Sequence, residues 1–222
     1  MAPTPPTPDP AEILRYLGCT VSPAPAELVR AVEQGCRDVL EAARPRTVWR
    51  RFPLQGRQVA GTSLALEGRD ILEHLEGCGE VILMAATLGP DVERLLMRSG
   101  VQDLSRAVVL DACASGVIEA VCNALEEDLR REQRARGLWL TGRFSPGYGD
   151  LPLSHQREIC TVLDVQRRIG LTLSATGLMI PRKSVTALLG LSDRPLHRGG
   201  GGCARCSMAE HCLMRKGGKC SE

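Results

Sequence analysis

The segment at residues 143–150, with the sequence RFSPGYGD, combines residue types that could hold a small charged molecule. Arg143 carries a planar guanidinium whose paired N–H donors match a carboxylate or a phosphate. Tyr148 adds a flat aromatic face with a hydroxyl at its tip. Pro146 fixes its own φ, and the two glycines permit positive φ and a close approach of the backbone to a ligand. The segment therefore predicts either a small-molecule clamp or a Gly- and Pro-rich turn with an incidental surface arginine.

A second candidate group lies on one face of a long helix predicted at residues 103–136. Ala112, Ser115, Gly116 and Glu119 recur there at spacings of three or four, which places them on one side of the helix. Small residues on a helix most often let another element pack closely. The alternative is room for a ligand, with the Glu119 carboxylate facing it.

The second half of the same helix is amphipathic. Ile118, Val121, Leu125 and Leu129 form its predicted buried stripe. The charged residues within 126–132 fall on other sides of the helix, and they are interpreted as a solvated face with no further role.

Four of the ten cysteines lie near the end of the chain, as Cys203, Cys206, Cys212 and Cys220. In the spacing C-x2-C-x5-C-x7-C, the first pair can chelate a metal from a tight turn and the other two can complete a four-thiolate shell. His211 could replace one thiolate. Zinc and an iron–sulfur cluster both accept four thiolates, so the ligand type does not decide between them. A tail that binds no metal is the third alternative. The other six cysteines lie in apolar or helical contexts and are interpreted as small core residues.

The composition narrows the class of protein. A chain of 222 residues can bury one substantial core, and its net charge of +2 provides no broad basic field for nucleic acid. Aromatic residues make up only 3%, too few for a base-stacking platform. The N-terminus lacks a basic-then-apolar signal pattern, and no uninterrupted apolar run is long enough to span a membrane. A cytoplasmic protein with reduced thiols is expected, without nucleic-acid or membrane partners.

Apolar periodicity and turn residues predict the elements that position these groups. Helices are expected at residues 9–18, 25–43, 71–77, 90–100, 103–136 and 154–163, and extended segments at 47–54, 59–66, 80–86, 138–141, 169–173, 177–180 and 184–189. Asp9, Asp103 and Ser154 are expected to cap three of the helices. Because strands and helices do not alternate strictly, the pattern predicts an α+β fold whose antiparallel or mixed sheet has helices on one side.

The chain divides into three parts. Residues 1–10 form a Pro-rich arm predicted to be disordered, residues 11–196 one folded domain, and residues 197–222 a Gly linker with the cysteine-rich tail. The sequence contains no G-x-x-x-x-G-K-[ST] phosphate loop, no G-x-G-x-x-G turn between strand and helix, and no G-x-S-x-G or H-E-x-x-H motif. The residues alone therefore indicate a polar clamp and a metal-binding tail on an α+β domain.

A set of short motifs resembles the activation domain, the S-adenosylmethionine-binding domain, of cobalamin-dependent methionine synthase. The resemblance rests on R-x-x-x-G-Y at residues 143–148, G-L-T-L-S at 170–174, M-x-P at 179–181 and S-V at 184–185, in this order after the Glu119 helix. It extends over roughly residues 13–192. It implies a curved, mainly antiparallel sheet flanked by helices.

By this resemblance, Arg143, Gly147, Tyr148 and the backbone at Ser145 would hold S-adenosylmethionine, and Glu119 matches an acidic contact of the family. The ligand has a carboxylate for a guanidinium, an ammonium and ribose hydroxyls for a carboxylate, and an adenine and a sulfonium for a ring or carbonyls.

Two family contacts have no clear counterpart in this chain. Leu189 stands where the family places an aromatic contact after the S-V motif, and the family's early acidic contact finds no counterpart near Trp49.

The resemblance implies a reaction in which the methyl group of S-adenosylmethionine goes to cobalamin after one-electron reduction of cob(II)alamin. The chain contains no D-x-H-x-x-G cobalamin signature. The corrinoid is therefore expected on a separate polypeptide, a methionine synthase core or a related corrinoid protein, and this chain would be a free-standing activator. The hypothesis for the tail is an iron–sulfur cluster that delivers the electron, with a separate electron donor as a possible partner.

Two other functions are compatible with the sequence. The first is a non-catalytic accessory subunit that docks on a corrinoid protein and uses a zinc knuckle only for structure. The second is an S-adenosylmethionine-dependent methyltransferase acting on an unrelated substrate, which is disfavoured because the chain lacks a Rossmann-type glycine loop.

Overall fold

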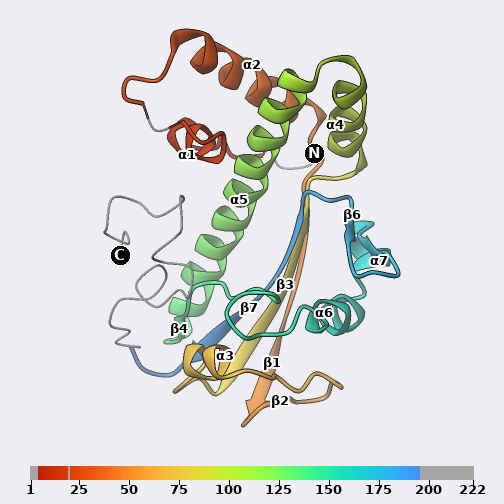
Figure 1. Ribbon diagram of the computed structural model, residues 1–222. Coiled ribbons are helices and arrows are strands. Elements are labelled where there is room, and N and C mark those ends of the chain that lie inside the picture. Colours follow the sequence, from red (N-terminus) through yellow and green to blue (C-terminus); the bar gives the residue numbers. More distant parts are fainter. Residues whose placement is uncertain (1–4, 20, 196–222) are drawn as a thin grey trace.

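The computed structural model describes residues 5–19 and 21–195. A five-stranded sheet with the strand order β2-β1-β3-β7-β4 runs through its centre, and every neighbouring pair of strands is antiparallel (Figure 1). The strands are β1 Arg46–Gln55, β2 Gln58–Val59, β3 Glu80–Thr87, β4 Trp139–Leu140 and β7 Ser184–Ser192, and β5 Thr172–Leu173 pairs with β6 Met179–Ile180 in a separate hairpin. The helices are α1 Pro10–Tyr16, α2 Ala26–Ala42, α3 Arg69–His74, α4 Pro90–Gln102, α5 Leu104–Arg134, α6 His155–Leu163 and α7 Val165–Ile169.

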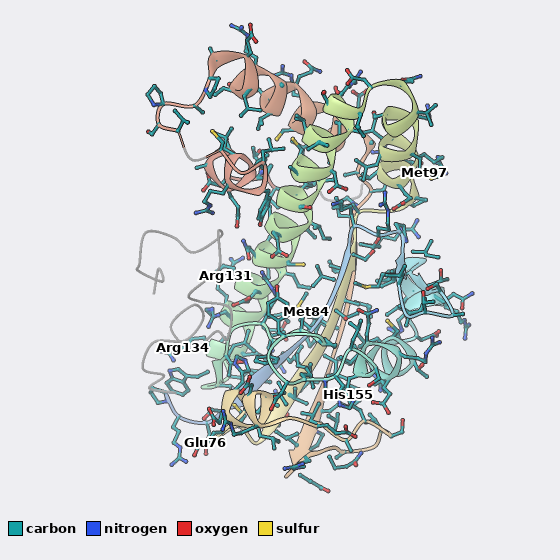
Figure 2. The ribbon with its side chains drawn as sticks, viewed as in Figure 1. Glu76, Met84, Met97, Arg131, Arg134 and His155 are labelled. Atoms are coloured by element: carbon teal, nitrogen blue, oxygen red, sulfur yellow. The ribbon has the colours of Figure 1, made fainter. Side chains whose placement is uncertain are left out.

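Helices cover both faces of the sheet, so the predicted one-sided arrangement is wrong. On β3, Ile82 and Met84 belong to the core that faces α5, whereas Leu83 and Ala85 belong to a second core under α3, α6 and α7. Met84 lies between the sheet and α5, and His155 lies in the layer on the other side (Figure 2). The physical reason is the unbroken apolar run of β3, because a strand without a polar face must be covered on both sides. The predicted α+β class and mainly antiparallel sheet are confirmed.

The longest helix, α5, packs on one face of the sheet, and its first part extends beyond the strands beside α2 and α4 (Figure 1). Asp103 caps it by accepting the Arg106 N–H at 3.0 Å, as predicted, and Ile118, Val121 and Leu129 of the predicted stripe are buried. By length and composition alone α5 could cross a membrane, with a window of mean hydropathy 1.6 that is half buried in the fold. Core helices meet the same criteria, and α5 packs on α2, α4 and the sheet.

The other predicted caps have mixed outcomes. Asp9 accepts the Ala11 N–H at 2.9 Å at the start of α1, as predicted. Ser154 precedes α6, but its side chain makes no cap hydrogen bond. The extended segments predicted at residues 47–54 and 59–66 join as a hairpin over two residue pairs only, Leu54 with Val59 and Gln55 with Gln58.

Gly190 in β7 provides a test of the packing between the sheet and α3. A Cβ at this position would lie 2.5 Å from Cys78 Sγ, 2.9 Å from Leu75 Cδ2 and 3.0 Å from Thr141 Cγ2. We expect Gly190→Ala to lower the free energy of unfolding by about 1–3 kcal/mol, because three neighbours must shift at once. Urea denaturation followed by circular dichroism measures the change.

Gly79→Ala is the matched control, since a Cβ there would meet nothing within 4 Å. It should change the free energy of unfolding by less than about 0.5 kcal/mol. Equal stabilities of the two variants would contradict the packing described for β7.

Candidate functional site

Arg143 follows β4 in the chain and comes directly before a residue that is bonded to the central sheet. Its neighbour Phe144 bridges to β7, with Phe144 N–H donating to Leu188 O at 2.9 Å and Leu188 N–H donating back at 2.8 Å. The two bonds fix the backbone next to Arg143 on the central sheet. The Arg143 guanidinium is thereby directed at α5, and its side chain is only 17% exposed.

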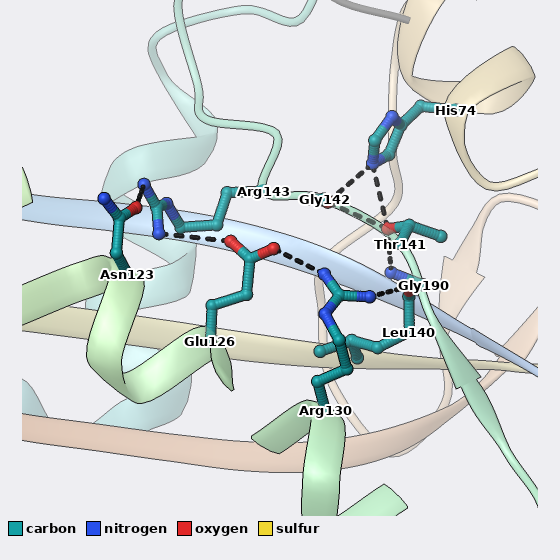
Figure 3. A network of polar contacts seen from close by, with 9 residues as sticks. All are labelled: His74, Asn123, Glu126, Arg130, Leu140, Thr141, Gly142, Arg143 and Gly190. Atoms are coloured by element: carbon teal, nitrogen blue, oxygen red, sulfur yellow. Dashed lines mark hydrogen bonds and ion pairs between the residues drawn. The ribbon is translucent and has the colours of Figure 1, made fainter. Parts of the chain in front are cut away.

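The guanidinium of Arg143 meets three acceptors from successive turns of α5. Its Nη2 lies 3.0 Å from Glu119 Oε2 and 2.8 Å from Asn123 Oδ1, and its Nη1 lies 3.1 Å from Glu126 Oε2. Arg130 donates to the second oxygen of Glu126 at 2.7 Å, so that carboxylate lies between two cations (Figure 3). The structure thus brings together Arg143 and Glu119, two residues singled out in the sequence.

Asn123 and Glu126 were missed by the sequence interpretation. Glu126 was assigned to a solvated face, and this is wrong, because its side chain is 19% exposed and bonded to two arginines. The available signal was the spacing of Glu119, Asn123, Glu126 and Arg130, which continues one helical face by steps of four, three and four. Helical periodicity alone could not show that an arginine distant in sequence would meet this face.

The loop after Arg143 is ordered by its own backbone. Gly147 N–H donates to Leu151 O at 2.9 Å, and Tyr148 N–H donates to Ser145 O at 3.1 Å. Gly147 has φ 90° and Gly149 has φ 51°, the left-handed values for which glycine is suited. The ring of Tyr148 is 68% exposed and free to cover a bound molecule. The loop therefore has a defined backbone conformation, while the roles of Ser145, Gly147 and Tyr148 in ligand binding stay predictions.

The small residues on α5 have two different structural roles. A Cβ on Gly116 would lie 2.9 Å from Ile13 Cγ1 and 3.2 Å from Pro8 Cβ, so this glycine lets α1 and the chain before it pack closely. Ala112 and Ser115 instead line a cavity of about 580 Å³ between α1, α4 and α5. Pro8, which is buried here, belongs to the predicted arm of residues 1–10, whose first four residues lie outside the described part.

Lys183 provides a second cation on the same side of α5. Its Nζ lies 3.0 Å from Asp111 Oδ1 and donates to Ser115 Oγ at 2.8 Å. Glu119 therefore lies one helical turn from a lysine-bound serine and in contact with Arg143. Along this stretch of α5, the carboxylates of Asp111 and Glu119 are each paired with a cation from another part of the chain.

The floor near the site is apolar. Leu189 is fully buried in the core that faces α5, and it pairs with Ile82 of β3. Trp49 of β1 packs at the margin of the same core. Leu189 thus contributes only an aliphatic surface at the position for which the sequence resemblance implies an aromatic ring.

The predicted metal ligands Cys203, Cys206, Cys212 and Cys220 lie outside the described residues. Within residues 5–19 and 21–195, no group of three or more His, Cys, Asp or Glu side chains could hold a metal ion. Burial raises the pKa of Cys122 to about 12 and that of Cys160 to about 11, which keeps both thiols neutral. With buried Cys113 they confirm the predicted core role for three of the six cysteines, whereas Cys19, Cys36 and Cys78 are only partly buried.

The fold and the site define an α+β domain in which one long helix and a Gly- and Pro-rich loop enclose an arginine–carboxylate cluster. A solved structure has the same fold: the MetH reactivation domain bound to AdoHcy matches with a TM-score of 0.58, covering 89% of this chain and 84% of that chain at 16% identity. No protein-family model and no curated protein matches the chain. The activation-domain resemblance is therefore confirmed at the level of the fold.

The arginine–carboxylate cluster can be tested by a double-mutant cycle on Arg143 and Glu126. We expect a coupling energy of about 1–2 kcal/mol from urea denaturation of Arg143→Met, Glu126→Gln and the double variant, because the pair is largely shielded from water. The control cycle on Arg131 and Asp128, whose side chains are 71% and 67% exposed, should give less than about 0.5 kcal/mol. Equal couplings in the two cycles would contradict the buried cluster.

Proposed function

We propose that this protein binds S-adenosylmethionine at Arg143 and Glu119 and supports reductive methylation of a corrinoid carried by a separate polypeptide, a methionine synthase core or a related corrinoid protein. The observation that supports it best is the Arg143–Glu119 ion pair, located in a fold shared with the MetH reactivation domain bound to AdoHcy. AdoHcy is the demethylated form of S-adenosylmethionine and has the same amino-acid group.

The residues present fit that amino-acid group. A ligand carboxylate can accept from the Arg143 guanidinium, and a ligand ammonium can donate to Glu119, so each member of the existing ion pair gains a new partner of opposite charge. Asn123 and Glu126 hold the guanidinium in place while this exchange occurs. The amino-acid group, which carries one charge of each sign, therefore leaves the charge balance of the site unchanged.

The loop supplies the remaining contacts of the proposed site. The exposed ring of Tyr148 can cover the adenosyl group or the sulfonium, and Gly147, with φ 90°, forms the turn that presents this ring. The backbone at Ser145 is bonded into the same turn through its carbonyl oxygen. The role of these residues is to orient the sulfonium methyl group toward a corrinoid on the partner.

The corrinoid supplies the methyl acceptor after its cobalt takes one electron. We propose that Cys203, Cys206, Cys212 and Cys220 hold an iron–sulfur cluster that delivers this electron, with zinc as the alternative. A zinc knuckle would favour the accessory docking subunit, in which the tail has only a structural role. An electron donor and a cytoplasmic location also belong to this proposal.

Calorimetric titration with S-adenosylmethionine tests the binding claim. We expect the wild-type protein to bind, and Arg143→Ala to bind at least about tenfold more weakly because a charge-assisted contact to the ligand carboxylate is lost. Tyr148→Phe should bind nearly as tightly as the wild type if the ring face makes the contact.

Arg131→Ala is the control for the general loss of an arginine, because Arg131 is 71% exposed on the outer side of α5. It should leave the affinity unchanged. If the wild-type protein produces no heat of binding at millimolar ligand, the proposed function fails.

Metal analysis tests the tail. We expect anaerobically purified protein to contain iron and acid-labile sulfide with a broad visible absorption, and a variant with Cys203 and Cys206 replaced by serine to lose both. Chelation and reconstitution with iron and sulfide should restore the absorption. Stoichiometric zinc without sulfide would contradict electron delivery by the tail.

A further inference from the structure

The short helix α3 contacts both ends of the loop that carries Arg143 and Tyr148. At the far end of the loop, Asp150 Oδ2 accepts the Arg69 N–H at 2.7 Å and Asp150 Oδ1 accepts the Asp70 N–H at 3.0 Å. Both donors are the first backbone amides of α3, which have no partner within the helix. The Asp150 side chain thus fastens the end of the loop to the start of α3.

The near end of the loop is fastened to the last residue of the same helix. His74 Nε2 lies 2.9 Å from Gly142 O and 3.0 Å from Thr141 Oγ1, immediately before Arg143 (Figure 3). The His74 ring also lies 5.1 Å from the ring of Phe144, centroid to centroid, on the other side of Arg143. One side chain of α3 therefore contacts residues on both flanks of Arg143, the backbone of Gly142 on one side and the ring of Phe144 on the other.

Two glycines show that the backbone packs tightly against the carboxylates at the Asp150 contact. A Cβ on Gly68 would lie 2.4 Å from Asp150 Oδ1, and a Cβ on Gly149 would lie 2.3 Å from Asp70 Oδ2. Their φ values of 111° and 51° are also unfavourable for other residues. The backbone can approach the two carboxylates only because both positions lack a side chain.

The charge of Asp150 favours the contact. Hydrogen bonds from the Arg69 N–H, which has the larger effect, and from the Asp70 N–H stabilise the ionised carboxylate. They hold the pKa of Asp150 below its ordinary value. The carboxylate is therefore ionised at neutral pH, when it accepts both bonds.

We propose that Asp150 and His74 are positioning residues that hold residues 142–150 in the ligand-binding conformation by anchoring both ends of the loop to α3. The inference rests on the proposed function, because it concerns the same loop. Neither residue is assigned a contact with the ligand. Each acts through the backbone that carries Arg143 and Tyr148.

The proposal has a quantitative consequence. If only a fraction of the molecules has the anchored loop, the apparent dissociation constant for S-adenosylmethionine rises in inverse proportion to that fraction. Loss of an anchor should therefore weaken binding by the same factor by which it lowers the anchored fraction. A general loss of stability would not produce this equality, since it acts on the whole fold.

The experiment measures hydrogen exchange of the loop peptide in the ligand-free protein and the affinity for S-adenosylmethionine by calorimetry. We expect Asp150→Ala to speed exchange at residues 143–151 and to raise Kd about tenfold, with circular dichroism and the unfolding midpoint nearly unchanged. Asp150→Asn keeps one acceptor oxygen and should restore part of both effects. His74→Ala should act in the same direction, while Asp128→Ala on the outer face of α5 should change neither quantity.

The outcomes separate the two claims. Unchanged exchange and unchanged Kd in Asp150→Ala, with a wild-type protein that binds, would overturn the anchoring proposal and leave the proposed function standing. Faster loop exchange in a protein that does not bind S-adenosylmethionine would overturn the proposed function and confirm the anchor as a feature of the loop. A rise in Kd without faster exchange would also overturn the anchoring proposal.

Discussion

The site depends on one interaction, the sharing of the Arg143 guanidinium among Glu119, Asn123 and Glu126. A largely buried guanidinium must have acceptors for its donors, and here they come from three successive turns of α5. The cluster therefore fixes the distance between α5 and the loop, with Phe144 tying the loop to β7. The apolar cores hold the layers together, but this cluster determines where the loop lies on them.

In the proposed function, the same cluster would receive a zwitterion without a large rearrangement. An arginine already paired with a carboxylate presents both charges that an amino-acid group needs, and the second carboxylate keeps the cation in position. The cost of holding the arginine in one conformation is met before the ligand arrives. Under the anchoring proposal, affinity then depends on how firmly the contacts with α3 hold the loop backbone.

Much of the fold could be predicted because local rules decide it. Asp9 and Asp103 cap their helices, and the apolar run of β3 forms a central strand, as their sequences indicate. The same apolar run also implies that both faces of the sheet are covered, although the prediction placed helices on one side only. The partners of Glu126 could not be predicted, because periodicity gives the face of a helix and not what crosses it. Contacts such as that of Asp150 with the start of α3 join residues distant in the sequence, and no local pattern reveals them.

The central claim is that this chain presents S-adenosylmethionine to a corrinoid on another polypeptide. The most direct measurement combines the purified protein with a corrinoid protein in the cob(II)alamin state, methyl-labelled S-adenosylmethionine and a one-electron reductant, and follows the label. The account predicts transfer of label to the corrinoid, with the absorption spectrum of methylcobalamin, only when this protein is present. Label that stays on S-adenosylmethionine, although the ligand binds and the cobalt is reduced, would contradict it.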